Sequence, residues 1–123
     1  MIEDPVRPPA DSDAALAPEQ CRTMVEVRAG VDAVDRALID LLAVRFGYMA
    51  AAARIKPERN MVRDEARKAQ VIGNALSRAE TFGLPQDAIG ALWEQLVEAS
   101  IAYELTLFDR RASDPMHSDR KPL

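Results

Sequence analysis

The stretch that decides the fold is residues 24–55, which reads MVEVRAGVDAVDRALIDLLAVRFGYMAAAARI. Its apolar positions recur at alternating steps of three and four, the heptad pattern of a helix that packs lengthwise against another helix. The pattern predicts one long helix between Pro18 and Pro57, of about 36 residues and roughly 54 Å. The positions of this seam are Met24, Val27, Val31, Val34, Leu38, Leu41, Arg45, Tyr48, Ala52 and Ile55.

A helix of that length extends beyond any globule that the folded part of the chain can build. A compact domain of about 90 residues has a radius of gyration of roughly 12–13 Å. The apolar seam continues along the overhang and needs a cover, and symmetric pairing of two copies is the commonest arrangement among oligomers. We therefore expect a homodimer in which the long helices are paired or interleaved.

The remaining chain predicts two further helices and no strands. The second runs from about Arg63 to Phe82, with Gly83 as its stop signal, and the third runs from Pro85 to about Arg110. Period-2 alternation is not sustained over six residues anywhere, so the fold class is all-α. Residues 1–17 and 112–123 are rich in proline and polar residues and are expected to be mobile tails around a helical domain at 18–111.

Composition excludes several classes of function. The 123 residues carry 16 Lys+Arg against 20 Asp+Glu, a net charge of −4, which argues against nucleic acid or an anionic membrane as the partner. Cys21 is the single cysteine and His117 the single histidine, so neither a metal site nor a histidine-based triad is expected. The acidic, proline-containing start is unlike a signal peptide, and the longest apolar runs are too short to span a membrane. We expect a cytoplasmic protein.

Charged residues interrupt the apolar seam of the long helix. Arg45 occupies a seam position, where an unpaired charge is costly. Lys56 follows eleven residues later, about 20° from the same face and roughly 16 Å away along the axis. Arg28 precedes Arg45 by seventeen residues, about 25 Å, so it can reach the same place only from a partner chain. The spacing of Arg45 and Lys56 leaves room for one small anion.

The third predicted helix repeats the anomaly. Ser100 and Glu104 fall in an apolar stripe with Trp93, Val97 and Phe108. Arg45 and Glu104 could form a buried salt bridge, with Ser100 as a small packing residue, because buried charges are usually paired. Alternatively, these groups line an enclosed anion site.

These residues resemble a known family, the all-helical chorismate mutases (the AroQ class), which includes isochorismate pyruvate-lyases. The resemblance covers residues 24–110, and the spacing of Arg28, Arg45 and Lys56 agrees with the family pattern without a gap. The segments that carry it are Val27-Arg28, Val34-Asp35, Leu41-Leu42-Ala43-Val44-Arg45, Ile55-Lys56, Val62-Arg63-Asp64-Glu65-Ala66-Arg67 and Glu98-Ala99-Ser100.

The resemblance implies an intertwined dimer with two sites that bind chorismate, a small dicarboxylate. Arg28 would enter the partner's site. The other matched positions are Arg45 and Lys56 on the long helix, Asp64 and Arg67 at the start of the second helix, and Ser100 and Glu104 on the third. Of these, Arg45, Lys56 and Glu104 are implied to be catalytic and the others to bind substrate.

Lys68 departs from the family pattern. Many similar mutases have there a glutamate that binds the ring hydroxyl of the substrate, and the similar lyases lack it. Lys68 could itself contact substrate, leave hydroxyl binding to the backbone near Asp64, or be a solvated lysine without a role.

The resemblance favours a chorismate mutase of aromatic amino-acid biosynthesis. An isochorismate pyruvate-lyase and a noncatalytic helical dimer or regulatory module stay as alternatives.

The implied reaction is a concerted rearrangement of chorismate to prephenate, which needs no nucleophile, metal or cofactor. The protein would hold a reactive conformer and stabilise the charge that develops as the C–O bond breaks. Glu104 can donate to the ether oxygen only when protonated, so we expect activity to rise toward mildly acidic pH.

Overall fold

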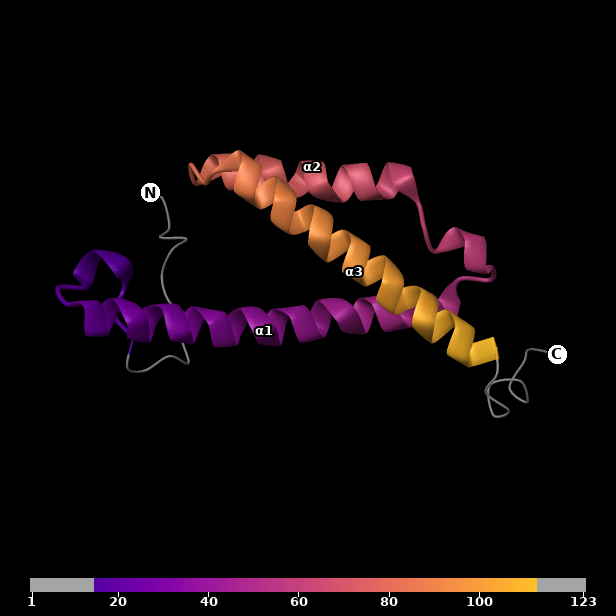
Figure 1. Ribbon diagram of the computed structural model, residues 1–123, viewed down its shortest axis with the longest axis horizontal. Helices are drawn as coiled ribbons and strands as arrows, with labels where there is room; N and C mark the ends of the chain where they lie inside the picture. The colour runs from indigo at the N-terminus through magenta and orange to yellow at the C-terminus, as the bar shows by residue number, and fades with distance from the viewer. Residues whose placement is uncertain (1–14, 113–123) are drawn as a thin grey trace. The chain divides into compact units, whose positions relative to one another are not determined.

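The computed structural model describes residues 15–112, and these residues form helices and no strand (Figure 1). A short 3-10 turn, Pro18–Gln20, precedes the long helix α1, Met24–Ile55. A second 3-10 turn, Arg59–Met61, leads to α2, Glu65–Thr81, and α3, Gln86–Ala112, follows. The predicted all-α class with one very long N-terminal helix is confirmed.

The start of α1 differs from the prediction, because the first residues after Pro18 form a separate turn. Thr23 and Glu26 explain the later start. The Glu26 N–H donates to Thr23 Oγ1 at 3.2 Å, and Glu26 Oε1 accepts from the Thr23 N–H at 3.1 Å. This reciprocal pair is a capping box, which satisfies two backbone donors at a helix start. It sets the first residue of the helix at Met24, so α1 has 32 residues.

Local signals also set both ends of α2. Asp64 accepts a hydrogen bond from the Arg67 N–H at 3.0 Å and is the N-cap, so α2 begins two residues after the predicted Arg63. At the other end, Gly83 has φ +68°, a conformation that glycine adopts without strain. The Leu84 N–H donates to Ala79 O and the Gly83 N–H to Glu80 O, the two bonds of a Schellman motif. The predicted stop at Gly83 is confirmed.

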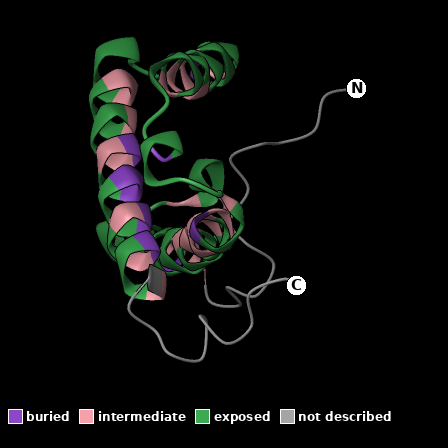
Figure 2. Ribbon diagram, turned by 90° about the vertical axis from the view of Figure 1, so that its right-hand side faces the viewer, coloured by how far each residue is buried: buried purple, intermediate pink, exposed green. Residues whose placement is uncertain are grey.

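The described chain divides into two compact units, and the division lies within α1 between Arg45 and Phe46. The core of the second unit consists of side chains from the end of α1, the following loop, α2 and α3. Figure 2 shows that buried positions are few and that most of the ribbon is exposed or intermediate. The buried residues of this core are Ala53, Val62, Val97, Ile101 and Phe108, with Val71, Ile72, Trp93, Leu105 and Leu107 packed around them.

The apolar seam of α1 is exposed in the single chain. Its large apolar side chains are between 38% and 70% exposed, from Val27 at the lower limit to Ile55 at the upper. Burial of apolar area is the main favourable term in helix association, at about 25 cal/mol per Å². The seam therefore retains its capacity to bind another helix.

The predicted tails fall almost wholly outside the described residues, and so does His117. Residues 15–17 precede the first turn without regular secondary structure, and Ala112 belongs to α3. Within residues 15–112, no helix combines the length and the apolar character that crossing a membrane requires.

Candidate active site

The chain places Lys56 immediately after the last residue of α1, facing α3. Its backbone N–H still donates to Ala52 O at 2.9 Å, so its position continues the helical geometry. The Lys56 ammonium forms an ion pair with Glu104, with 2.8 Å between Nζ and Oε2. The Glu104 side chain is 5% exposed and that of Lys56 is 29% exposed. A nearly buried carboxylate on α3 therefore holds a cation that solvent still reaches.

Ser100 lies one helical turn before Glu104 on the same face of α3 and is buried. Its Oγ donates to Leu96 O at 2.7 Å. A hydroxyl in this arrangement can rotate to donate to a ligand, because the carbonyl of Leu96 also takes part in the helix. We call Lys56, Ser100 and Glu104 the central cluster. These three were singled out from the sequence, and the structure brings Lys56 and Glu104 into contact.

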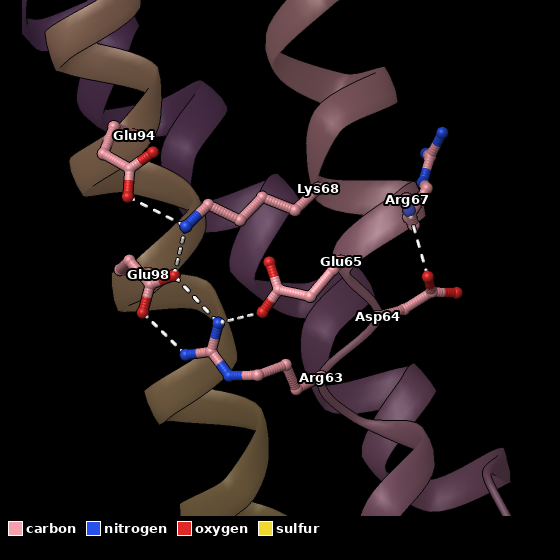
Figure 3. A network of polar contacts seen from close by, with 7 residues as sticks. All are labelled: Arg63, Asp64, Glu65, Arg67, Lys68, Glu94 and Glu98. Atoms are coloured by element: carbon pink, nitrogen blue, oxygen red, sulfur yellow. Dashed lines mark hydrogen bonds and ion pairs between the residues drawn. The ribbon is translucent and has the colours of Figure 1, made fainter.

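Asp64 and Arg67 lie at the start of α2, as the sequence predicted, and are engaged locally. Asp64 Oδ1 caps the helix, and Arg67 Nη1 donates to Gln70 Oε1 at 2.7 Å. Figure 3 shows the Arg67 side chain on the opposite side of α2 from Glu94 and Glu98. In this conformation Arg67 does not point toward α3.

Lys68 extends from α2 to α3, where two carboxylates hold its ammonium (Figure 3). Nζ lies 2.8 Å from Glu94 Oε2 and 2.7 Å from Glu98 Oε2. The side chain of Lys68 is only 16% exposed. The interpretation of Lys68 as a solvated lysine is therefore wrong, because burial and two ion pairs fix it between the helices.

Arg63 completes the same network. Its guanidinium donates to both oxygens of Glu98, at 2.7 and 3.1 Å, and to Glu65 at 3.0 Å. The hydrogen bonds from Arg63 and then from Lys68 lower the pKa of Glu98 to about 2. The carboxylates of Glu94 and Glu98 raise the pKa of Lys68 above its usual value. Glu98 and Lys68 therefore keep their charges over the whole physiological range of pH.

Arg28 and Arg45 belong to the first unit. Arg28 is exposed on α1, and Arg45 is half-buried. Both lie on one continuous helix, so the spacing of about 25 Å expected from the sequence holds along its axis. Their contact with a ligand, and the entry of Arg28 into a partner's site, stay predictions.

A pocket of about 290 Å³ lies elsewhere in the first unit, between residues 16–21 and the first turns of α1. Leu16 and the seam residues Val27, Val31 and Val34 give it an apolar lining. None of the predicted site residues contributes to it.

Sequence reasoning missed the partners that hold the predicted residues in place. Glu94 and Glu98 are spaced i, i+4 on α3, which puts two carboxylates on one face and could have identified a site for a cation. Arg111 lies in the last turn of α3, and its guanidinium binds backbone carbonyls at the end of α1, which no sequence pattern indicated.

Comparison with known proteins identifies the family of this chain. The chorismate mutase type II family matches residues 27–105, which include every predicted site residue from Arg28 to Glu104. The match covers more than half of the chain, so the chain belongs to the chorismate mutase type II family, a family of enzymes with chorismate-like substrates. It is also similar to the isochorismate pyruvate lyase of Pseudomonas aeruginosa, with 26% identity over 88 residues, 72% of this chain and 87% of that protein.

Proposed function

We propose that this protein is a chorismate mutase, which converts chorismate to prephenate for aromatic amino-acid biosynthesis. The observation that carries the proposal is the ion pair between Lys56 and the nearly buried Glu104, at 2.8 Å. In the rearrangement the ether C–O bond breaks as a new C–C bond forms, and negative charge develops on the ether oxygen. A fixed ammonium close to that oxygen stabilises the transition state more than the ground state.

Each member of the central cluster has a distinct task in this proposal. Lys56 donates to the ether oxygen and to a carboxylate of the substrate. Glu104, in its protonated form, donates to the same ether oxygen from the other helix. Ser100 gives up its bond to Leu96 O and donates to a substrate carboxylate. Arg45 binds a carboxylate as well, with the bidentate geometry that a guanidinium allows.

The active form in this proposal is a homodimer with shared sites. It is supported by the exposed seam of α1, whose large apolar side chains are at least 38% exposed in the single chain. Arg28 of one protomer then binds substrate in the site of the other. A cytoplasmic location, expected from the sequence, stays a prediction.

Asp64 and Arg67 have a supporting role at the start of α2. Asp64 fixes the first turn as its N-cap, and one of its oxygens is engaged in doing so. Arg67 reaches substrate if its guanidinium exchanges Gln70 for a substrate oxygen. Lys68 is engaged by Glu94 and Glu98, so we assign hydroxyl recognition to the backbone near Asp64 rather than to its side chain.

The second candidate function is an isochorismate pyruvate-lyase. Lys68 favours it, because the glutamate that many similar mutases use for the ring hydroxyl is absent here. The similarity to the Pseudomonas aeruginosa lyase also favours it. Both reactions break the ether bond beside the same cations, so the central cluster is compatible with either.

Incubation of the purified protein separately with chorismate and with isochorismate tests the proposal. NMR of the reaction mixture identifies the product. Prephenate formed from chorismate supports the mutase proposal. If only isochorismate reacts, and gives salicylate and pyruvate, the protein is the lyase instead. If neither substrate reacts, the noncatalytic helical dimer is the remaining alternative. The matched control is Arg45→Met, which removes a cation of the proposed site and should abolish most turnover of either substrate.

A further inference from the structure

The end of α1 leaves a backbone acceptor that the main chain cannot satisfy. In a continuing helix the Ala53 carbonyl would accept from the N–H of residue 57. That residue is Pro57, which has no N–H. The carbonyls of Arg54 and Lys56 are likewise among the last of the helix and lack donors within it. Lys56, a member of the central cluster, is thus at a helix end that needs an external donor.

Arg111 of α3 supplies that donor. Its Nη1 lies 2.8 Å from Ala53 O and 2.7 Å from Lys56 O, and Arg54 O is at 3.2 Å. A guanidinium Nη carries two hydrogens, so the two shortest contacts are the principal bonds. Nη2 lies 3.4 Å from Pro57 O. The positive charge also lies at the negative end of the α1 dipole, where a cation is favoured.

Phe108 fixes the guanidinium from the other side. The Arg111 Cζ lies 3.9 Å from the centroid of the buried Phe108 ring, one turn earlier on α3. A cation over an aromatic face is attracted to it and loses rotational freedom. The guanidinium is therefore held between an aromatic ring and the carbonyls at the end of α1.

Glu104 and Arg111 hold Lys56 at two points. They are seven residues apart on α3, which places them on the same face about 10 Å apart. Glu104 holds the ammonium of Lys56, and Arg111 holds its carbonyl. The Arg59–Asp109 ion pair also connects the following loop to α3, but both of its side chains are more than half exposed, so it contributes less.

We propose that Arg111 is a positioning residue for Lys56. It replaces the donor that Pro57 lacks, fixes the end of α1 on α3, and thereby keeps the Lys56 ammonium opposite Glu104. The proposal rests on the proposed function for the catalytic task of Lys56, but the positioning of its ammonium can be measured without turnover.

Amine labelling of the whole protein measures that positioning directly. An N-hydroxysuccinimide ester reacts with free lysine amines, and peptide mass spectrometry gives a separate rate for Lys56 and for Lys68. Arg111→Met should raise the labelling rate of Lys56 about tenfold, the effect of losing one charge-assisted hydrogen bond. Lys68 is the internal reference, because its carboxylates are on α3 but distant in sequence from Arg111, and its rate should change less than about twofold.

Two further variants make the test specific. Arg111→Lys keeps the positive charge but lacks the planar guanidinium with its several N–H donors. The labelling rate of Lys56 should therefore lie between those of wild type and Arg111→Met. Arg59→Met is the matched control, because it removes the exposed ion pair with Asp109 that also connects the loop after α1 to α3. The labelling rate of Lys56 in this variant should stay within about twofold of wild type. An unchanged Lys56 rate in Arg111→Met, or an equal rise at Lys56 and Lys68, would overturn the proposal.

Turnover gives the second readout. With the substrate that wild type accepts, Arg111→Met should lower kcat about tenfold and change KM less, because Lys56 acts mainly on the transition state. If wild type accepts neither chorismate nor isochorismate, the proposed function fails, and the labelling rates still decide the role of Arg111.

Discussion

The Lys56 ammonium lies 2.8 Å from the Glu104 carboxylate, and this ion pair joins the end of α1 to the middle of α3. Glu104 is nearly buried, so its charge depends on Lys56 for compensation. We propose that the ether oxygen of the substrate binds at this pair, with a cation on one side and a carboxyl group on the other.

Glu104→Gln should flatten the dependence of activity on pH. A carboxylic acid donates to the ether oxygen only when protonated, so wild-type kcat/KM should rise on acidification. Glutamine donates at every pH. Rate profiles of the two proteins between about pH 8 and pH 5 check this, and parallel profiles would refute the assignment of Glu104 as a donor.

Ser100→Ala should raise KM about tenfold, because the substrate carboxylate loses one hydrogen-bond donor. Thr106→Ala is the matched control. Thr106 is on the same helix and its hydroxyl bonds to Ala102 O at 3.0 Å, as that of Ser100 bonds to Leu96 O, but Thr106 is exposed. Steady-state kinetics should give a wild-type KM for Thr106→Ala. Equal KM values for the two variants would contradict a binding role for Ser100.

Glu98→Gln should lower thermal stability at neutral pH, and the loss should disappear in acid. The pKa of Glu98 is lowered to about 2 in the folded protein, from an ordinary value of 4.5. A carboxyl with a depressed pKa stabilises the fold above its unfolded pKa and loses that effect as the pH falls through its folded pKa. The Tm difference from wild type should therefore shrink between pH 4.5 and about 2.

Circular dichroism melts at a series of pH values measure this difference. Glu80→Gln, which removes an exposed carboxyl of α2 outside the Arg63–Lys68 network, is the control. A Tm difference for Glu98→Gln that stays constant down to pH 2 would show that the ion pairs with Arg63 and Lys68 do not stabilise the fold.

Mixing two inactive variants should restore activity if the sites are shared between protomers. Arg28→Ala and Lys56→Met each damage every site of their own homodimer. In a mixed dimer one site receives an intact Arg28 and an intact Lys56. After unfolding and refolding of an equal mixture, we expect about a quarter of wild-type activity. Activity no higher than the mean of the separate variants would contradict Arg28 acting in the partner's site.

Local patterns predicted the helices well because each depends on a few neighbouring residues. The heptad seam identified α1, and Gly83 identified the end of α2, where the positive φ requires a residue without a side chain. The start of α1 was misplaced because Pro18 is a strong helix-start signal, whereas the capping box at Thr23 and Glu26 decides the structure.

The candidate site was predictable where a polar residue interrupts an apolar pattern. Glu104 and Ser100 were found in this way, and both are buried. The role of Arg111 could not be predicted from such a pattern, because its partners are backbone carbonyls 55 to 58 residues away in the sequence. The sequence left several roles open for Lys68 for a similar reason, since its contacts are with carboxylates of another helix.

The rate of prephenate formation from chorismate by Lys56→Met tests the account most directly. Arg54→Met, which removes an exposed cation two residues earlier, is the control, and circular dichroism verifies that both variants fold. We predict that kcat/KM falls about 10²- to 10³-fold for Lys56→Met, the usual cost of removing a preorganised donor to a developing oxyanion. Arg54→Met should stay within about twofold of wild type. A folded Lys56→Met protein that forms prephenate at the wild-type rate would contradict the account.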